Sequence, residues 1–151
     1  MEKKREPKKI FIQGAIPVEK IATSIANHQH KTNIGAHDIF LGQVRADEID
    51  GKIVDAIEYT AYEEMAEKVV HEIREKAFEK FELTCAHIYH SLGKVKTGEL
   101  CFFVFTSSPH RTMAFEATRF IVEEIKANAP IYGKEIFEDT SSQWKKNTPV
   151  S

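Results

Sequence analysis

The sequence predicts an α+β fold, a sandwich in which helices pack against paired strands. Strand and helix patterns follow one another in the order β-α-β-β-α-β-β-α-β, and the turn segments Asp50-Gly51 and 93–98 join neighbouring strands as hairpins. Parallel strands need long crossovers, so the hairpins favour the α+β class over a doubly wound parallel sheet. The chain also carries no glycine-rich phosphate loop and no internal repeat.

Length and composition fit a single soluble domain. The 151 residues are 42% hydrophobic and 29% charged, which is ordinary for a globular protein. The net charge of -2 argues against a nucleic-acid-binding protein, and no long apolar run predicts a membrane span. We expect a disordered basic leader over 1–7, a single domain over 8–140 and a C-terminal tail over 141–151.

The first residues and the two cysteines indicate the cellular compartment. The start of the chain is charged and lacks the apolar stretch of a signal peptide. Without a secretion signal, Cys85 and Cys101 are expected to be reduced core residues, and the apolar neighbours of Cys101 predict a buried, inert thiol there. The sequence therefore predicts a cytoplasmic protein.

The first half of the chain predicts one short helix and three strands. Apolar residues at helical spacing follow Pro17, and Asp50-Gly51 favours a tight hairpin turn. The expected elements are a strand over 8–13, a helix from Pro17, a polar loop over 28–33, a strand over 34–45 and a strand over 53–62.

The second half predicts two longer helices and three strands. In the helix over 63–81, apolar residues repeat every four positions from Met65 through Val69 and Ile73 to Ala77. Strands are expected over 83–92, 99–106 and 131–137. The third helix is apolar at Met113, Ala117, Phe120, Ile121 and Ile125, and it ends at Ala129 because the residue before a proline avoids helical geometry.

The start of this third helix carries an unusual pair of cations. Ser108 predicts its N-cap and Pro109 its first helical position. His110 and Arg111 then fall in the first turn, where the helix dipole favours acidic side chains. Free N–H groups and cations at one place favour a bound anion, and a solvated surface pair is the alternative.

Two further cations are candidate site residues. Arg45 can bind a carboxylate or phosphate with its fork of donors, or it is a solvated strand end. Lys126 either complements the dipole at a helix end or is a partly desolvated acid, base or nucleophile. Arg111 and Lys126 are 15 positions apart, which is about 22 Å along one helix. If both serve one small ligand, a symmetric dimer must bring opposite helix ends together.

The histidines give a weaker signal. Cys85 and His87 share one face of a strand, but His90 points to the other face. His28 and His30 lie in a polar loop without a third partner nearby in the sequence. The sequence therefore predicts no metal site.

An ordered set of motifs between about residues 35 and 144 resembles the large, catalytic subunit of molybdopterin synthase. The matching segments include Phe40-Leu41-Gly42-Gln43-Val44-Arg45, Glu58-Tyr59-Thr60-Ala61-Tyr62, His90-Ser91-Leu92-Gly93, Ser107-Ser108-Pro109-His110-Arg111 and Lys126-Ala127-Asn128-Ala129-Pro130-Ile131-Tyr132-Gly133-Lys134-Glu135. Each segment alone is a weak signal, whereas the set in this order and spacing is specific.

The resemblance implies an activity and an assembly. Family members convert cyclic pyranopterin monophosphate to molybdopterin by adding two sulfurs as a dithiolene. The sulfur arrives as a thiocarboxylate on the C-terminal glycine of a small, ubiquitin-like subunit. Two large subunits form a central homodimer within a heterotetramer, and the implied fold is an α/β hammerhead with an added antiparallel sheet subdomain. The resemblance implies no cofactor.

The resemblance also assigns site residues by position. The substrate pocket corresponds to Arg45, His110, Arg111 and Lys126, lined by the backbone at Gln43, Val44, Gly133, Lys134 and Glu135. Lys126 is the expected main catalytic residue, and in the family the pair matching His110 and Arg111 comes from the neighbouring large subunit. Because the family usually has a lysine at Gly133, Lys134 is the candidate for a second catalytic lysine, although a strand turns it to the other face.

Two other function classes compete with this interpretation. A non-catalytic module that binds an anionic metabolite or an acidic tail needs Arg45, His110 and Arg111 but not Lys126. A purely structural dimerisation subunit needs none of the four.

Overall fold

The computed structural model describes residues 7–145 and has the predicted mixture of strands and helices. The elements are β1 (Phe11–Gln13), α1 (Val18–Ala26), β2 (Ala36–Gln43), β3 (Glu48–Ile49), β4 (Lys52–Ala61), α2 (Glu63–Lys80), β5 (Cys85–Lys96), β6 (Leu100–Ser108), α3 (Arg111–Asn128), β7 (Ile131–Phe137) and β8 (Ser142–Trp144). The predicted order is confirmed, with the short strands β3 and β8 added to it. Most of the expected leader, and residues 146–151 of the expected tail, lie outside the described residues.

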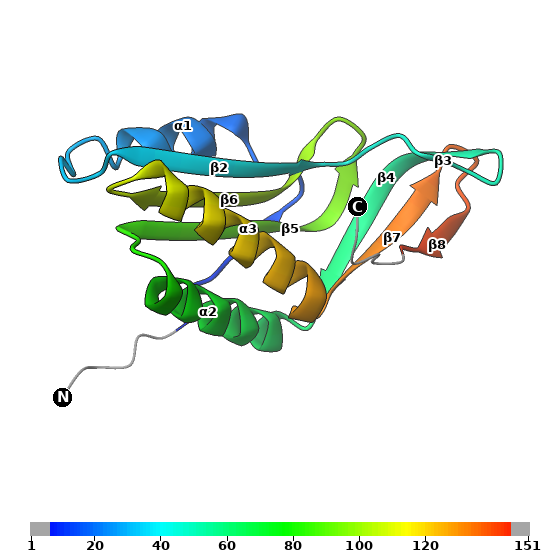
Figure 1. The fold of residues 1–151 in the computed structure, drawn as a ribbon. Helices are drawn as coiled ribbons and strands as arrows, with labels where there is room; N and C mark the ends of the chain where they lie inside the picture. The colour runs from blue at the N-terminus through cyan, green and yellow to red at the C-terminus, as the bar shows by residue number, and fades with distance from the viewer. Residues whose placement is uncertain (1–6, 146–151) are drawn as a thin grey trace.

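One long strand joins two antiparallel sheets. The first half of β5 pairs with β6 from Cys85 to His90, and its second half pairs with β4 from Gly93 to Lys96. The strand order is β2-β6-β5-β4-β7-β8, with β1 parallel to β5 and β3 paired with β4. Figure 1 shows β4, β7 and β8 extending beyond the helices as a separate sheet. The predicted turn over 93–98 is thus too long, because the pairing with β4 keeps the chain extended to Lys96.

The helices cover opposite faces of the sheet that contains β2, β5 and β6 (Figure 1). Alternation along β6 sends Phe102 and Val104 into the larger core beside α2 and α3, and sends Phe103 and Phe105 to the face covered by α1. Each fully buried phenylalanine contributes roughly 1.5–3 kcal/mol relative to an exposed one. The predicted α+β sandwich is confirmed, and within residues 7–145 no helix is long and apolar enough to cross a bilayer.

The apolar stripe of α2 is as predicted at Ile73 and Ala77, and its first half is shifted by one residue. Met65 is 60% exposed, whereas Ala66, Val70, Ile73 and Ala77 are buried. A helix has 3.6 residues per turn, so a strict four-residue repeat drifts around its surface. The observed spacing of four, three and four keeps the buried residues on one face.

The third helix begins later than its sequence predicts. Ser108 is the last residue of β6 and pairs with Ala36, and its carbonyl accepts the N–H of Gly35 at 3.0 Å. The predicted N-cap at Ser108 is therefore wrong, because the sheet uses that backbone. The extended residue His110 is the N-cap and makes no side-chain capping bond. The other end is as predicted, since α3 stops at Asn128 before an extended residue and a proline.

Candidate active site at the C-terminal end of α3

Lys126 lies in the last turn of α3 and is exposed as a residue, and the protein around its ammonium group desolvates that group in part. Burial is the largest cause that lowers the pKa of Lys126 below its usual value. The positive charges of Lys145 and Arg45 lower it further, whereas Cys101 and Glu123 act in the opposite direction. Lys126 therefore gives up its proton more readily than a solvated lysine does.

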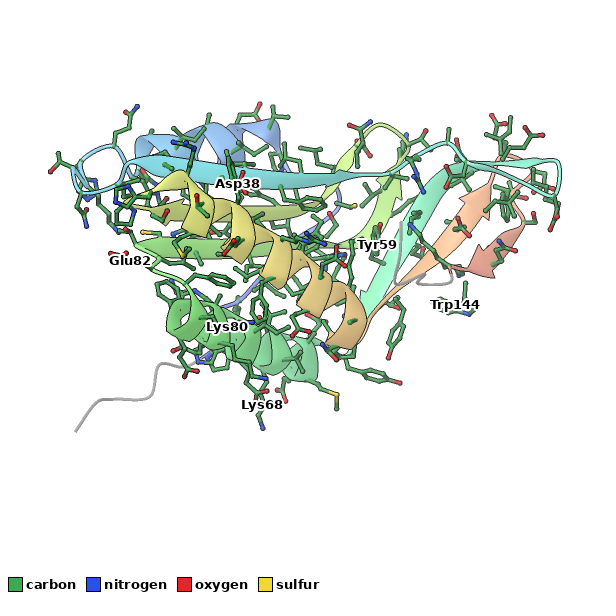
Figure 2. All side chains as sticks on the ribbon, viewed as in Figure 1. Asp38, Tyr59, Lys68, Lys80, Glu82 and Trp144 are labelled. Carbon is green, nitrogen blue, oxygen red and sulfur yellow. The ribbon has the colours of Figure 1, made fainter. Side chains whose placement is uncertain are left out.

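Buried polar side chains lie next to Lys126. Its Nζ is 6.0 Å from the ring centre of Phe102, which lies 5.2 Å from the ring of His90. The His90 ring in turn meets Tyr59 edge to face, with centroids 4.9 Å apart. We call Lys126, His90, Tyr59, Cys101 and Glu135 the Lys126 cluster. Figure 2 shows Tyr59 between the helical part and the extending sheet.

The protonation of two cluster members follows from their surroundings. His90 is 8% exposed, and burial lowers its pKa to about 4, with the charge of Lys126 adding to that effect. Its Nδ1 must carry the proton that it donates to the Ser91 carbonyl at 2.8 Å, because a carbonyl only accepts. The neutral ring then keeps Nε2 as an acceptor. Burial raises the pKa of Tyr59, and a hydrogen bond with Cys101 and the charge of Glu135 raise it further, so its hydroxyl stays protonated.

In the predicted 133–135 segment, Glu135 belongs to this cluster and Gly133 lies beside its member Tyr59, whereas Lys134 faces away. Gly133 pairs with Tyr59 in the β4–β7 ladder, and the next pair is Lys134 with Glu58 on the other face. Lys134 Nζ lies 3.6 Å from Glu58 Oε1. Glu135 is buried and accepts a hydrogen bond from the Gln143 amide at 3.2 Å. Of the two predicted catalytic lysines, Lys126 alone faces the buried polar groups.

Glycine at position 133 is a packing requirement in this chain. A Cβ there would lie 2.9 Å from Ile57 Cγ2 and 3.3 Å from Tyr59 Cε1. A lysine at this position would have to displace the side chains that hold the Tyr59 ring. The packing around position 133 thus suits the glycine found here and not the lysine that is usual in the family.

The residues of the predicted 43–45 segment lie in different environments. Gln43 is the exposed last residue of β2. Val44 is 2% exposed, its N–H donates to the Glu99 carbonyl at 3.0 Å, and its own carbonyl accepts the Gly98 N–H at 2.8 Å. Val44 is therefore a core residue whose backbone N–H and carbonyl bond to the loop between β5 and β6.

Arg45 presents its guanidinium to solvent near the Lys126 cluster. Its side chain is 76% exposed and contacts Asp47 at 3.3 Å through Nε. An exposed pair of this kind contributes little to stability, so an anionic ligand can replace the carboxylate. Its effect on the pKa of Lys126 shows that the two cations act on the same region.

His110 and Arg111 lie at the far end of α3. Both are exposed, and the first turn of the helix contains no acidic residue. Arg111 is the first residue of the helix and lies about 22 Å from Lys126 along its axis, at roughly 1.5 Å per residue. A single chain therefore does not bring these residues together with Lys126.

An open hollow with an aromatic rim lies at the edge of the extending sheet. Its volume is about 460 Å³, and its lining comprises Thr60, Ala61, Tyr62, Tyr132, Trp144 and Lys145. The Tyr62 and Tyr132 rings meet edge to face with centroids 6.1 Å apart, and Trp144 is 60% exposed. Lys145 donates its backbone N–H to the Gly133 carbonyl at 2.7 Å, and Gly133 pairs with Tyr59, so the hollow is next to the cluster.

The sequence predicts Glu135 as a site residue, but it does not predict that Tyr59, His90 and Cys101 lie in the same cluster as Lys126. Tyr59 and His90 both lie in segments that resemble the family, at 58–62 and 90–93, and these motifs are the signal that could have pointed to them. His28 has partners that are distant in the sequence, because one ligand atom each of His28, Cys85 and His87 lies within 4.8 Å of the others, whereas His30 is not part of this group.

Comparisons with known proteins agree on one family. A sequence model described as MoaE protein matches residues 13–128. The molybdopterin synthase catalytic subunit of Drosophila grimshawi is 41% identical over 127 residues, which cover 80% of this chain but 35% of that protein. The subunit of the same name from Pyrococcus abyssi is 39% identical over 108 residues, 72% of each chain. The X-ray structure of molybdopterin synthase from Staphylococcus aureus superposes with a TM-score of 0.78 at 31% identity, over 92% of this chain and 98% of that one.

Proposed function

The chain belongs to the MoaE protein family, and we propose that it is the catalytic subunit of a molybdopterin synthase. It transfers sulfur from the thiocarboxylated C-terminal glycine of a small, ubiquitin-like partner to cyclic pyranopterin monophosphate. Residues 8–140 form its catalytic domain, and it works in the cytoplasm as a homodimer within a heterotetramer.

The observation that carries this proposal is the state of Lys126. A lysine whose pKa is lowered by partial desolvation and by the charges of Lys145 and Arg45 is an available base, and such groups concentrate at functional sites. The nearby hollow, with its exposed aromatic rim, offers apolar surface to an incoming tail. Family membership and this lysine therefore point to the same end of α3.

The chemistry needs no nucleophilic side chain, because the thiocarboxylate sulfur is itself the nucleophile. It adds to the carbonyl carbon of the pterin side chain, whose oxygen takes up protons and leaves as water while the neighbouring carbon gives up a proton, and the partner stays attached as a thioester. Water then cleaves the bond between the thioester carbonyl carbon and the sulfur, and the partner departs with a C-terminal carboxylate. The neutral amine of Lys126 takes the proton from the attacking water, and its ammonium form stabilises the departing carboxylate.

The phosphate of the pterin needs cations, and the two ends of α3 supply them from different copies. Arg45 from one subunit and His110 and Arg111 from the other offer donors to the phosphate oxygens. A twofold axis that pairs opposite helix ends creates two equivalent sites. The two-copy arrangement rests on the separation of about 22 Å between Arg111 and Lys126.

Reconstitution tests the proposal directly. The purified chain is mixed with a small subunit carrying a C-terminal thiocarboxylate and with cyclic pyranopterin monophosphate, and the pterin is analysed by mass spectrometry. We expect a product that has gained two sulfurs. If the wild-type chain binds the pterin phosphate tightly but the mass never changes, the protein is instead a binding module.

A further inference from the structure

A second cluster of nitrogen and sulfur atoms lies on the face of the sheet that α1 covers. His28 follows the C-terminus of α1, and Cys85 and His87 lie two residues apart on β5. One ligand atom from each lies within 4.8 Å of the others. The proposed sulfur transfer uses none of these residues.

The hydrogen bonds of His28 aim one lone pair at this cluster. Its Nδ1 lies 2.6 Å from the Ser24 carbonyl, so that nitrogen carries a proton and donates it. In the neutral ring Nε2 is therefore the acceptor, and it lies 3.1 Å from His87 Nε2. Metal-binding histidines commonly hold their second nitrogen against a carbonyl in this way.

The spacing of the atoms fits a tetrahedral ion after a small adjustment. With metal–nitrogen bonds of about 2.0 Å and a metal–sulfur bond of about 2.3 Å, two tetrahedral nitrogens lie about 3.3 Å apart and nitrogen and sulfur about 3.5 Å apart. The observed nitrogen pair at 3.1 Å is close to that geometry. The sulfur lies at most 4.8 Å from the two nitrogens. It must therefore move by up to about 1.3 Å to reach the tetrahedral spacing, which is within reach of a side-chain rotation.

The surroundings are largely dry but positively charged. Cys85 is 5% exposed and His28 8% exposed, and the Phe105 ring lies 5.0 Å from that of His28. Lys31 Nζ lies 3.1 Å from the Cys85 sulfur. Lys8 and Arg74 also act on His87. A cation must therefore displace Lys31 from the sulfur, and a thiolate ligand offsets part of the positive charge.

We propose that His28, Cys85 and His87 bind one zinc-class divalent cation, with the fourth coordination position open. Two imidazoles and a thiolate suit Zn²⁺, whereas Mg²⁺ and Ca²⁺ prefer oxygen ligands. The ion joins the end of α1 to β5, and its binding is independent of the proposed sulfur transfer.

Cobalt is the probe that reports this ligand set. The full chain, freed of metal with a chelator, is titrated with Co²⁺ while its absorption spectrum is recorded. We expect one Co²⁺ per chain, an intense thiolate-to-metal charge-transfer band, the visible bands of a tetrahedral ion, and loss of all of them when Zn²⁺ is added.

Variants assign the spectrum to the three residues. C85S should abolish the charge-transfer band, and H28Q should weaken Co²⁺ binding by at least about tenfold. The matched controls C101S and H30Q keep both, because Cys101 belongs to the other cluster and His30 is exposed. K31M should tighten binding several-fold, since it removes the cation beside the sulfur.

Two results would overturn the proposal. One is a wild-type chain that gives no saturable charge-transfer band. The cluster would then serve only to make the His28–His87 hydrogen bond and the Lys31–Cys85 contact. The other is a C85S chain that keeps the wild-type band. Circular dichroism checks the fold of each variant. If C85S does not fold, H28Q decides the test, and unchanged Co²⁺ affinity in H28Q would then overturn the proposal.

Discussion

The two ends of α3 differ in how far their own chain surrounds them. At the C-terminal end, Lys126 is partly desolvated and lies near the buried, neutral His90 and the protonated Tyr59. At the N-terminal end, Arg111 and His110 are exposed, the first turn has no acidic residue, and neither makes an ion pair within residues 7–145. One end is thus completed by its own fold, and the other is a bare cationic surface.

The difference indicates where the chemistry lies and where a second copy is needed. Desolvating a lysine costs stability, and such a cost is usual where a shifted pKa serves a reaction. Exposed cations at a helix N-terminus cost less but attract anions weakly when water surrounds them. When the N-terminal end of α3 from one copy lies against the C-terminal end of α3 from another, the phosphate binds at a site from which water is partly excluded.

Removing the amine at position 126 is the change with the largest expected effect. K126A should lower product formation by about 10²–10⁴-fold, the range typical of losing a general acid or base. Reconstitution with thiocarboxylated partner and mass analysis measures it. The matched control is K76A, an exposed lysine on α2, which should keep wild-type turnover. A K126A chain that works at the wild-type rate would remove Lys126 from the mechanism.

The buried histidine beside Lys126 should make the fold sensitive to acid. The pKa of His90 is about 4 in the folded chain against 6.5 for a free histidine, so the unfolded state takes up the proton first as pH falls. The free energy of unfolding should therefore decrease between about pH 6.5 and about pH 4, by up to about 3 kcal/mol from this group.

Urea denaturation at several pH values measures this slope. In the H90Q chain the free energy of unfolding should depend less steeply on pH, because unfolding no longer takes up about one proton between about pH 6.5 and about pH 4. The exposed His30 provides the control, because H30Q should leave the slope unchanged. Equal slopes in wild-type and H90Q chains would show that His90 is not held neutral by burial.

Alanine substitutions at Gly35 and Gly133 test how tightly the chain packs near the two ends of α3. A Cβ at Gly35 would lie 2.1 Å from the Pro109 carbonyl oxygen just before the helix, and a Cβ at Gly133 would lie 2.9 Å from the Ile57 methyl group. Backbone cannot yield as a side chain can, so G35A should be the more destabilising change. Both should cost about 1–3 kcal/mol in urea denaturation, as overpacking usually does. A larger cost for G133A would reverse this ranking.

Much of the fold could be predicted from local patterns. The Asp50-Gly51 turn is confirmed, because both residues have positive φ, 52° and 78°. The predicted end of α3 is also correct, since it depends only on Pro130. The start of α3 could not be predicted locally, because pairing with β2 holds Ser108 in the sheet. The predicted burial of Met65 is wrong because a strict four-residue repeat drifts around the helix.

The candidate site was predictable in residue type but not in arrangement. The charge of Arg45 acts on Lys126, and Arg111 is far away along α3 as helix geometry requires. Which of Gly133 and Lys134 faces Tyr59 depends on the β4–β7 register, which no local pattern fixes. His28 joins Cys85 and His87 only because α1 packs on β5 and β6, a contact between residues 59 positions apart.

A mixing experiment tests most directly whether opposite ends of α3 from two copies form one site. R111A and K126A chains are each inactive in this arrangement. After subunit exchange, half of the dimers are mixed and each mixed dimer has one intact site, so about a quarter of the wild-type activity should return. If native mass spectrometry shows mixed dimers and the activity stays at the level of the parent chains, the shared site is wrong.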